Sequence, residues 1–371
     1  MAKASFCGSP VKIKVIGLGG SGCNTVSRMV RGDVRGVEFI AMNTDRQSLS
    51  LTEAPVRHQL GRIITKGMGA GGDRELGRKA AEENSDEIAA LVSDTDLVFI
   101  TCGMGGGTGT GGAPVVADIA RKAGALTLAV VSKPFSFEGQ HRSEVAEQGL
   151  SAMAGNIDAM VVVSNDRLLE LQDRRLGIEE AFLLSDQLLK QGIEVISGVL
   201  NTPGIINLDF ADIKAVLKNS GPAFMSIGIG RGPKRAVEAA QAALTGPLMD
   251  VSVAGARSVL FNIAGSDNLT LHEVNEAAEF IKRVATPEAN IIFGVAHDPV
   301  IQPNEVKISL IAAGFTSVKQ CYGEDIKPRV IVKSPVNEYL PSEPPLATVW
   351  PLDQPFPTSL DKNIPQATLK E

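Results

Sequence analysis

The residues with the clearest chemical meaning are glycines, which gather at three places. In the first, Gly17, Gly19 and Gly22 have the spacing G-x-G-x-x-G, which between a strand and a helix is typical of dinucleotide-binding loops. The second stretch, Gly103–Gly112, holds seven glycines in ten residues, and the third is Gly67–Asp73. Glycines let successive backbone N–H groups curl around an anion. The three stretches therefore predict phosphate binding.

Gly103–Gly112 carries the strongest signal of the three. It follows the apolar run DLVFITC, and a helix is expected to begin at Ala113 and Pro114, because proline suits a first helical turn. A helix N-terminus adds partial positive charge, and the hydroxyl groups of Thr108 and Thr110 can donate hydrogen bonds. Two or three such loops on one sheet favour a triphosphate over a diphosphate. The sequence G-x-x-x-x-G-K-[ST] is absent, which argues against a P-loop enzyme.

Alternating strand and helix patterns must position these loops. Apolar runs predict buried strands at 12–18, 37–43, 96–102, 126–132 and 159–165, and helical patterns lie at 23–30, 74–92, 114–124 and 142–153. Strands that are apolar throughout indicate a parallel sheet covered on both faces. Ligands bind such sheets where loops leave the carboxyl ends of the strands.

A long helix and a second region follow. Residues 178–200 predict one helix with an apolar face, about 34 Å long at 1.5 Å per residue, ended by Pro203 and Gly204. Further strands are expected at 221–232, 256–265, 289–298 and 306–315, with helices near 207–219 and 272–285. Residues 341–357 then hold six prolines, which indicates a disordered linker and tail.

Composition narrows the class of protein. A formal net charge of −6 without a basic run argues against nucleic-acid binding. The cysteines and histidines are scattered, so neither a disulfide framework nor a metal site is indicated. No signal-like or membrane-spanning apolar run occurs, so we expect a cytoplasmic protein with no direct membrane insertion.

Five motifs in order resemble the tubulin/FtsZ family, and within it the bacterial cell-division members. They are GGSGCN (19–24), NTD (43–45), GGGTGTG (105–111), PFSFEGQHR (134–142) and NLDFAD (207–212). The likeness runs from about residue 11 to 317. It implies an N-terminal extension at 1–10, a GTP-binding α/β domain at 11–177, a central helix at 178–202, a smaller α/β domain at 203–317, and a linker with a terminal peptide at 318–371.

The resemblance also implies a guanine-nucleotide site, residue by residue. GTP or GDP would be held at its phosphates, with Mg²⁺ bound mainly through them, by Gly20, Ser21, Gly22, Cys23, Asn24, Asn43, Asp45, Ala70, Gly71, Gly72, Gly103, Met104, Gly105, Gly106, Gly107, Thr108, Gly109 and Thr110. Glu138 and Arg142 would lie on the sugar side. Asn165, Phe182 and Asp186 would surround the guanine, whose two donors suit a carboxylate.

Hydrolysis is assigned by the resemblance to Asn207, Asp209 and Asp212. These residues would enter the nucleotide site of the next subunit and orient the attacking water, so that GTPase activity would depend on head-to-tail assembly. The implied role is the division ring at mid-cell. The implied partners are other copies of the chain and, through the tail, membrane tethers and division regulators; the terminal Gln-Ala-Thr-Leu departs from the family pattern and weakens the second inference.

Plainer interpretations stay open for several of these residues. Phe182 fits the apolar helical face and could be core, Asp186 could be solvated, and Glu138 with Arg142 could be a surface pair. Asp209 and Asp212 could simply favour a helix N-terminus. The alternative functions are a Rossmann-type NAD-dependent oxidoreductase, for which no catalytic His or Lys stands out, and a nucleotide-binding scaffold that does not hydrolyse.

Overall fold

The computed structural model describes residues 11–32, 34, 36–167, 177–201, 204–245, 253, 255–286, 288–298 and 300–315. These residues belong to one compact unit that ends at Glu324. The expected N-terminal extension and the expected linker and tail lie outside the described residues, and the domain boundaries stay predictions.

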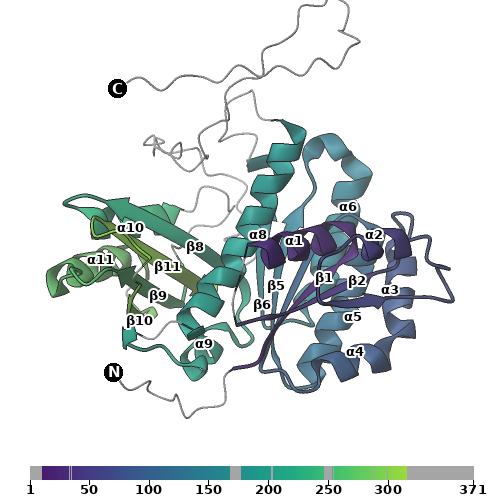
Figure 1. Cartoon of the computed structure of the whole chain (residues 1–371), viewed down its shortest axis with the longest axis horizontal. Helices are drawn as coiled ribbons and strands as arrows, with labels where there is room; N and C mark the ends of the chain where they lie inside the picture. The colour runs from purple at the N-terminus through teal and green to yellow at the C-terminus, as the bar shows by residue number, and fades with distance from the viewer. Residues whose placement is uncertain are drawn as a thin grey trace, which may run out of the picture. The chain divides into compact units, whose positions relative to one another are not determined.

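Six parallel strands form the first half of the sheet, in the order β3-β2-β1-β4-β5-β6 (Figure 1). Their bounds are β1 Ile13–Leu18, β2 Glu38–Asn43, β3 Val56–Gln59, β4 Leu97–Gly103, β5 Leu126–Lys133 and β6 Ala159–Ser164. The predicted parallel strands are confirmed because β1, β4 and β5 are apolar and buried along almost their whole length. The short strand β3 carries no apolar run and was not predicted.

Helices cover both faces of this half. One face packs against α1 (Gly19–Arg31) and α8 (Ile178–Asn201). The other face packs against α3 (Arg74–Glu83), α4 (Ser85–Val92), α5 (Gly107–Lys122) and α6 (Gln140–Ala154). The short helices α2 (Arg46–Ser50) and η1 (Ser136–Glu138) follow the ends of β2 and β5.

Two helix predictions are wrong in detail. The helix expected over 74–92 is two helices, α3 and α4, which meet at Asn84, whose side chain accepts a hydrogen bond from the Gly61 N–H group. Helix α5 begins at Gly107 rather than at Ala113, so Pro114 lies inside the helix. The glycines of its first turns serve close helix packing: a Cβ on Gly111 would lie 2.0 Å from the Arg74 carbonyl oxygen of α3.

The second half continues the same sheet as β6-β8-β11-β9-β10-β7. Its strands are β7 Gly204–Ile206, β8 Gly221–Arg231, β9 Ser258–Gly265, β10 Asn290–His297 and β11 Glu305–Ala313, and its helices are α9 Phe210–Leu217, α10 Arg235–Thr245 and α11 Leu271–Val284. Helix α10 and strand β7 were not predicted. The two halves join where Ala159 and Met160 of β6 pair with Gly221 and Pro222 of β8.

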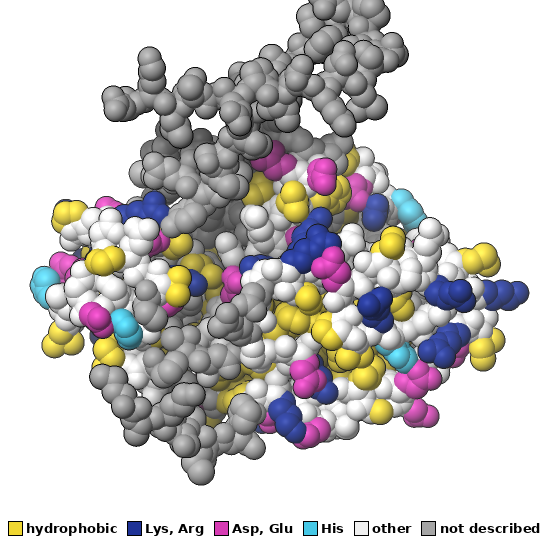
Figure 2. Space-filling view, in the orientation of Figure 1, with side chains coloured by type: hydrophobic (Ala, Val, Ile, Leu, Met, Phe, Trp, Pro, Cys, Tyr) yellow, Lys and Arg dark blue, Asp and Glu magenta, His cyan; other side chains and the backbone are white. Residues whose placement is uncertain are grey.

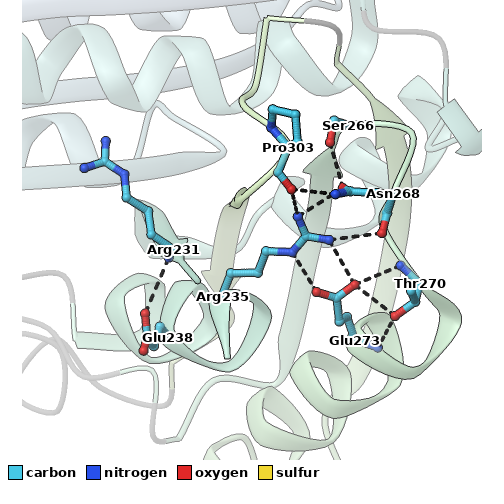
Figure 3. A network of polar contacts seen from close by, with 8 residues as sticks. All are labelled: Arg231, Arg235, Glu238, Ser266, Asn268, Thr270, Glu273 and Pro303. Atoms are coloured by element: carbon cyan, nitrogen blue, oxygen red, sulfur yellow. Dashed lines mark hydrogen bonds and ion pairs between the residues drawn. The ribbon is translucent and has the colours of Figure 1, made fainter. Parts of the chain in front are cut away.

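A polar cluster around Arg235 fastens three segments of the second half (Figure 3). The buried Arg235 guanidinium donates to both carboxylate oxygens of Glu273, at 2.6 and 3.1 Å, and to the side chain and backbone of Asn268, at 3.0 and 3.1 Å. It also donates to the Pro303 carbonyl group. The hydrogen bond from Arg235 lowers the pKa of Glu273 to about 2. We call Arg235, Asn268, Glu273 and Pro303 the Arg235 cluster.

The surface carries no single dominant charge on the face seen in Figure 2, where basic and acidic side chains are interspersed. Among the described helices, none is both long enough and apolar enough to cross a membrane.

Candidate functional site

The glycine stretches meet at the point where the strand order reverses. Strands β1 and β4 are neighbours in the sheet, although β2 and β3 lie between them in the chain. Connections leave β1 and β4 toward opposite sides, and parallel sheets bind ligands at such a switch point, outside the carboxyl ends of the strands. The first glycine stretch follows β1 and the second follows β4.

Two helices present uncapped N-termini at this point. Neither Leu18, which precedes α1, nor Gly106, which precedes α5, gives its helix a side-chain capping bond, and neither helix has an acidic residue in its first turn. By contrast, the neighbouring α2 and α3 are capped by the carboxylates of Asp45 and Asp73. The first N–H groups of α1 and α5 are therefore left for another acceptor, and an anion suits them.

The three stretches are packed against one another through glycine. A Cβ on Gly19 would lie 3.2 Å from the Gly109 nitrogen, and a Cβ on Gly103 would lie 2.9 Å from the Ser21 hydroxyl oxygen. A Cβ on Gly107 would lie 2.8 Å from the side chain of Ala70 in the third stretch. The structure thus brings the predicted phosphate-binding residues of all three stretches together.

Other glycines of the same stretches face open space. A Cβ on Gly20, Gly71, Gly72 or Gly106 would meet no atom within 4 Å. Gly71 and Gly72 have φ values of +57° and +83°, which other residues rarely adopt. Close packing on one side and free backbone on the other is the arrangement expected of a phosphate-binding site. We call the three glycine stretches together the glycine cradle.

The Asn43–Asp45 segment joins the second and third stretches. The Thr44 and Thr108 hydroxyl groups share a hydrogen bond of 2.6 Å, and the Thr44 carbonyl oxygen accepts from the Gly69 N–H group at 3.3 Å. Asn43 is buried and accepts from the Asp45 N–H group. Hydrogen bonds from the Ser48 hydroxyl and from the backbone N–H groups of Gln47 and Ser48 lower the pKa of Asp45.

Several predicted contacts can be made only by backbone. Thr110 is fully buried, and its hydroxyl accepts from the Gly105 N–H group at 2.8 Å, which holds the turn of the second stretch. The side chains of Met104 and Cys23 are also buried. Burial raises the pKa of the Cys23 thiol to about 12, which makes it an inert thiol.

A hollow of about 440 Å³ lies beside this cradle, lined by Arg46, Gln47, Ser50, Lys66 and Gly67. It touches only the edge of the third stretch and none of the uncapped N–H groups. The uncapped helices and open glycines, rather than this hollow, define the candidate phosphate site.

Glu138 and Arg142 form an ion pair of 2.7 Å beside the second stretch. Glu138 also accepts from the Phe135 N–H group at 2.9 Å, and the side chain of Arg142 lies so close to Gly105 that a Cβ there would be 2.7 Å from it. The pair is therefore more than an isolated surface contact, because it fixes η1 against the glycine loop.

Asn165, Phe182 and Asp186 come together where β6 ends and α8 begins. The Ser185 hydroxyl donates to Asn165 at 2.7 Å. Phe182 is not core: 40% of it is exposed, and its ring meets that of Phe135 edge-on with centroids 5.4 Å apart. Asp186 is not solvated: only 9% of it is exposed, and α1 supplies its partners.

Asn207, Asp209 and Asp212 stand apart from these residues. They follow the C-terminal end of α8, which at 1.5 Å per residue is roughly 36 Å long, and α9 lies at that end (Figure 1). Asp209 and Asp212 form a capping box at the start of α9, in which each carboxylate accepts the other residue's N–H group at 2.9 and 3.2 Å. The two acids therefore do cap a helix N-terminus, as the simpler interpretation of the sequence expected. Among the described residues, however, the other carboxylate oxygens, Asp209 Oδ2 and Asp212 Oδ1, accept no hydrogen bond.

Sequence reasoning missed several residues that shape the site. They are Thr25, Arg28, Thr44, Phe135, Phe137 and Ser185. Only Thr44 and the two phenylalanines gave a signal, because they fall within NTD and PFSFEGQHR.

Comparison with known proteins agrees with this geometry. Residues 12–173 match the profile described as Tubulin/FtsZ family, GTPase domain, and residues 221–316 match FtsZ family, C-terminal domain. This chain belongs to the tubulin/FtsZ family. It is a GTPase of the FtsZ type that binds guanine nucleotide, and the family assignment replaces the oxidoreductase alternative.

Solved structures give the same result. The empty FtsZ dimer of M. jannaschii is 41% identical, with a TM-score of 0.76 over 82% of this chain and 89% of that one. CetZ2 from Haloferax volcanii, a GTPγS-bound protofilament, is 20% identical with a TM-score of 0.70 over 84% and 95% of the two chains. CetZ1 from the same organism, a GDP-bound monomer, is 22% identical with a TM-score of 0.71 over 84% and 96%. The two CetZ likenesses show the fold alone.

Proposed function

We propose that this chain assembles head to tail and hydrolyses GTP only at the junction between subunits, as a filament-forming protein of cell division. The observation that carries the proposal is the separation of two incomplete sites. The glycine cradle presents uncapped N–H donors for phosphate, whereas Asp209 and Asp212, beyond the C-terminal end of α8, have carboxylate oxygens that accept no hydrogen bond among the described residues. Assembly would bring the two together.

Phosphate binding would rest on the backbone. The uncapped N–H groups of α1 and α5 would donate to the phosphate oxygens, and Gly71 and Gly72 would approach the γ-phosphate. Mg²⁺ would be held mainly by oxygen atoms of the phosphates and of water, with Asp45 the nearby carboxylate. Bound Mg²⁺ would neutralise phosphate charge.

Guanine recognition would rest on three side chains. Phe182 offers an exposed ring face for stacking, and Asp186 offers acceptors for the N1–H group and the exocyclic amine. Asn165, the residue that follows β6, lies beside them, held by Ser185. Glu138 and Arg142 would contact the sugar side.

Hydrolysis would use the carboxylates of the neighbouring subunit. Asp209 and Asp212, with Asn207, would orient a water molecule in line with the γ-phosphate and draw its proton away. The water oxygen would bond to the γ-phosphorus while the bond to the β–γ bridging oxygen breaks, leaving GDP and inorganic phosphate. The FtsZ dimer among the matched structures supports association between copies of the chain.

A protein titration tests the proposal directly. Specific GTPase activity, measured with sedimentation, should rise above a threshold concentration at which GTP-dependent polymer first pellets. Activity per molecule that is independent of concentration would overturn the shared site. Binding without turnover at any concentration would favour the non-hydrolysing scaffold.

Mixing two inactive variants gives a sharper test. Asp212→Asn retains the oxygen that accepts the Asp209 N–H group, so it should bind GTP but lose most turnover. Asp186→Asn should lose GTP binding while keeping its own Asp209 and Asp212. Mixed together, they should recover activity, because one supplies the nucleotide and the other the carboxylate. No recovery would place both sites within one subunit.

The division role and the tail stay further proposals. A fluorescent fusion should form a ring at mid-cell, and removal of residues 318–371 should abolish the ring but leave GTP-dependent pelleting intact. Loss of pelleting would instead assign the tail to assembly rather than to tethers and regulators.

A further inference from the structure

The carboxylate of Asp186 is held from both sides by α1. The Thr25 hydroxyl donates to Asp186 Oδ1, and the Arg28 guanidinium forms an ion pair with Asp186 Oδ2. The side chain of Asp186 is only 11% exposed, and that of Arg28 is 33% exposed. A carboxylate this buried stays ionised only where charge and hydrogen bonds compensate for lost water.

Helix α1 is suited to hold this carboxylate. Thr25 and Arg28 are three residues apart, so they share one helical face, and that face meets α8. Arg28 lies in the last turn of α1, where the helix dipole favours a cation. One helix therefore presents its N-terminus to the candidate phosphate site and its last turns to the candidate base site.

We propose that Arg28, with Thr25, is a positioning residue that sets specificity for guanine by fixing the plane and the charge of the Asp186 carboxylate. This inference rests on the proposed function of Asp186. Each carboxylate oxygen can accept two hydrogen bonds. The Thr25 hydroxyl occupies one acceptor position on Oδ1 and the Arg28 ion pair faces Oδ2, which leaves each oxygen an acceptor position for one of two parallel donors. Guanine offers such a pair in its N1–H group and exocyclic amine, whereas adenine has no N1–H group.

Inosine triphosphate separates this role from a structural one. It keeps the N1–H group of guanine but lacks the exocyclic amine, so it can use only one of the two acceptors. A carboxylate held in plane should bind GTP more tightly than ITP. A carboxylate freed from Arg28 can rotate out of this plane, so it should lose the second bond and with it most of the preference. A substitution that only damaged the fold would weaken the binding of GTP and of ITP by the same factor.

The experiment measures equilibrium binding of GTP, ITP and ATP to nucleotide-free protein, at concentrations where no polymer sediments. Arg28→Gln should weaken GTP binding about tenfold or more, as expected for loss of a charge-assisted hydrogen-bond partner. ITP binding should weaken less, so that the GTP/ITP ratio falls toward one. Arg28→Lys should recover part of the ratio because it restores the charge.

Arg31→Gln is the matched control. Arg31 lies one turn further along α1, and its partner is Glu53 at the surface, so all affinities should match those of the wild type. If Arg28→Gln does not fold, as judged by circular dichroism, Thr25→Val removes the other partner at nearly constant volume and should lower the same ratio.

Two results would overturn the role of Arg28. Equal loss of GTP and ITP would make Arg28 structural, and tighter GTP binding in Arg28→Gln would mean that Arg28 obstructs the base. A wild-type protein that binds ATP as tightly as GTP would overturn the guanine site itself together with this inference, and the wild-type measurement alone reveals that case.

Discussion

The glycine cradle and the Arg235 cluster differ in whether their polar groups have hydrogen-bond partners within the chain. In the cradle, the first N–H groups of α1 and α5 lack side-chain caps, and Gly20, Gly71, Gly72 and Gly106 face open space. In the Arg235 cluster, one guanidinium makes five hydrogen bonds to three residues, and Glu273 also closes the capping box of α11 with Thr270.

The difference shows which polar groups are there for the fold. Buried polar groups that serve stability are satisfied within the chain, because an unpaired buried donor costs about 1–3 kcal/mol. Polar groups at the carboxyl ends of the strands that have no partner within the chain, and that glycine leaves accessible, instead suit a ligand. This contrast separates the two regions without reference to any relative, and mutations should separate them as well.

The largest effect is expected from Arg235→Ala. The change removes the five hydrogen bonds of the Arg235 guanidinium and leaves the Glu273 carboxylate without its cation, so unfolding free energy should fall by about 3–5 kcal/mol. GTP affinity measured well below the unfolding transition should not change. Denaturant unfolding and nucleotide binding on the same samples check both expectations.

Lys234→Ala is the control for Arg235→Ala. Lys234 is exposed and directly precedes Arg235, so its loss should change stability by less than about 0.5 kcal/mol. Loss of GTP affinity in folded Arg235→Ala would show that the two regions are coupled rather than independent.

Gly106→Ala should give the reverse result. Its φ of −90° suits alanine, and no atom of the chain lies within 4 Å of the added Cβ, so thermal stability should hold. The methyl group would stand where phosphate approaches α5, and GTP affinity should fall about tenfold to a hundredfold, as for about 1.5–3 kcal/mol of charge-assisted hydrogen bonding. Calorimetric melting and equilibrium binding measure the two quantities. Unchanged affinity would move the phosphate away from the N-terminus of α5.

The sequence predicted the cradle better than the Arg235 cluster, for a physical reason. Apolar strands and glycine-rich turns are local signals, so β1, β4 and the three stretches could be located in advance. The pairing of Thr25 with Asp186 joins residues 161 positions apart, which no local pattern records. The Arg235 cluster likewise gathers segments that only the folded sheet brings together.

Local signals also failed where packing overrides them. Glycine is a poor helix former, so 107–112 was expected to be a loop, yet contact with α3 makes these residues helical. Helix α10 was missed because its buried face consists mainly of alanines, which are small and only weakly apolar, although Ala236, Ala239, Ala240 and Ala243 recur at helical spacing. Asp209 and Asp212 were expected as either water-orienting acids or helix-capping acids, and the capping role does not exclude the other.

Acid should weaken the Arg235 cluster in a defined range of pH. The pKa of Glu273 is lowered from 4.5 to about 2 by Arg235, so the carboxylate stabilises the fold fully above pH 4.5 and loses that contribution as the pH falls toward about 2. Glu273→Gln should be less stable at neutral pH and should flatten the dependence of unfolding free energy on pH in this range. An unchanged slope would mean that Glu273 titrates alike in the folded and unfolded states. Asp45→Asn replaces a more exposed carboxylate of the cradle, so it should flatten the dependence of unfolding free energy on pH less than Glu273→Gln does.

The smallest effect tests whether open space around a glycine is enough to mark a site. Gly198 lies inside α8, and like Gly106 it has no atom within 4 Å of an added Cβ. Because its backbone is already helical, Gly198→Ala should stabilise the fold by about 0.4–1 kcal/mol through loss of freedom in the unfolded chain. GTP affinity should stay that of the wild type, since no uncapped N–H group lies there. Weaker GTP binding in Gly198→Ala would mean that α8 transmits changes to the cradle, and Gly106→Ala could then no longer be explained by local contact alone.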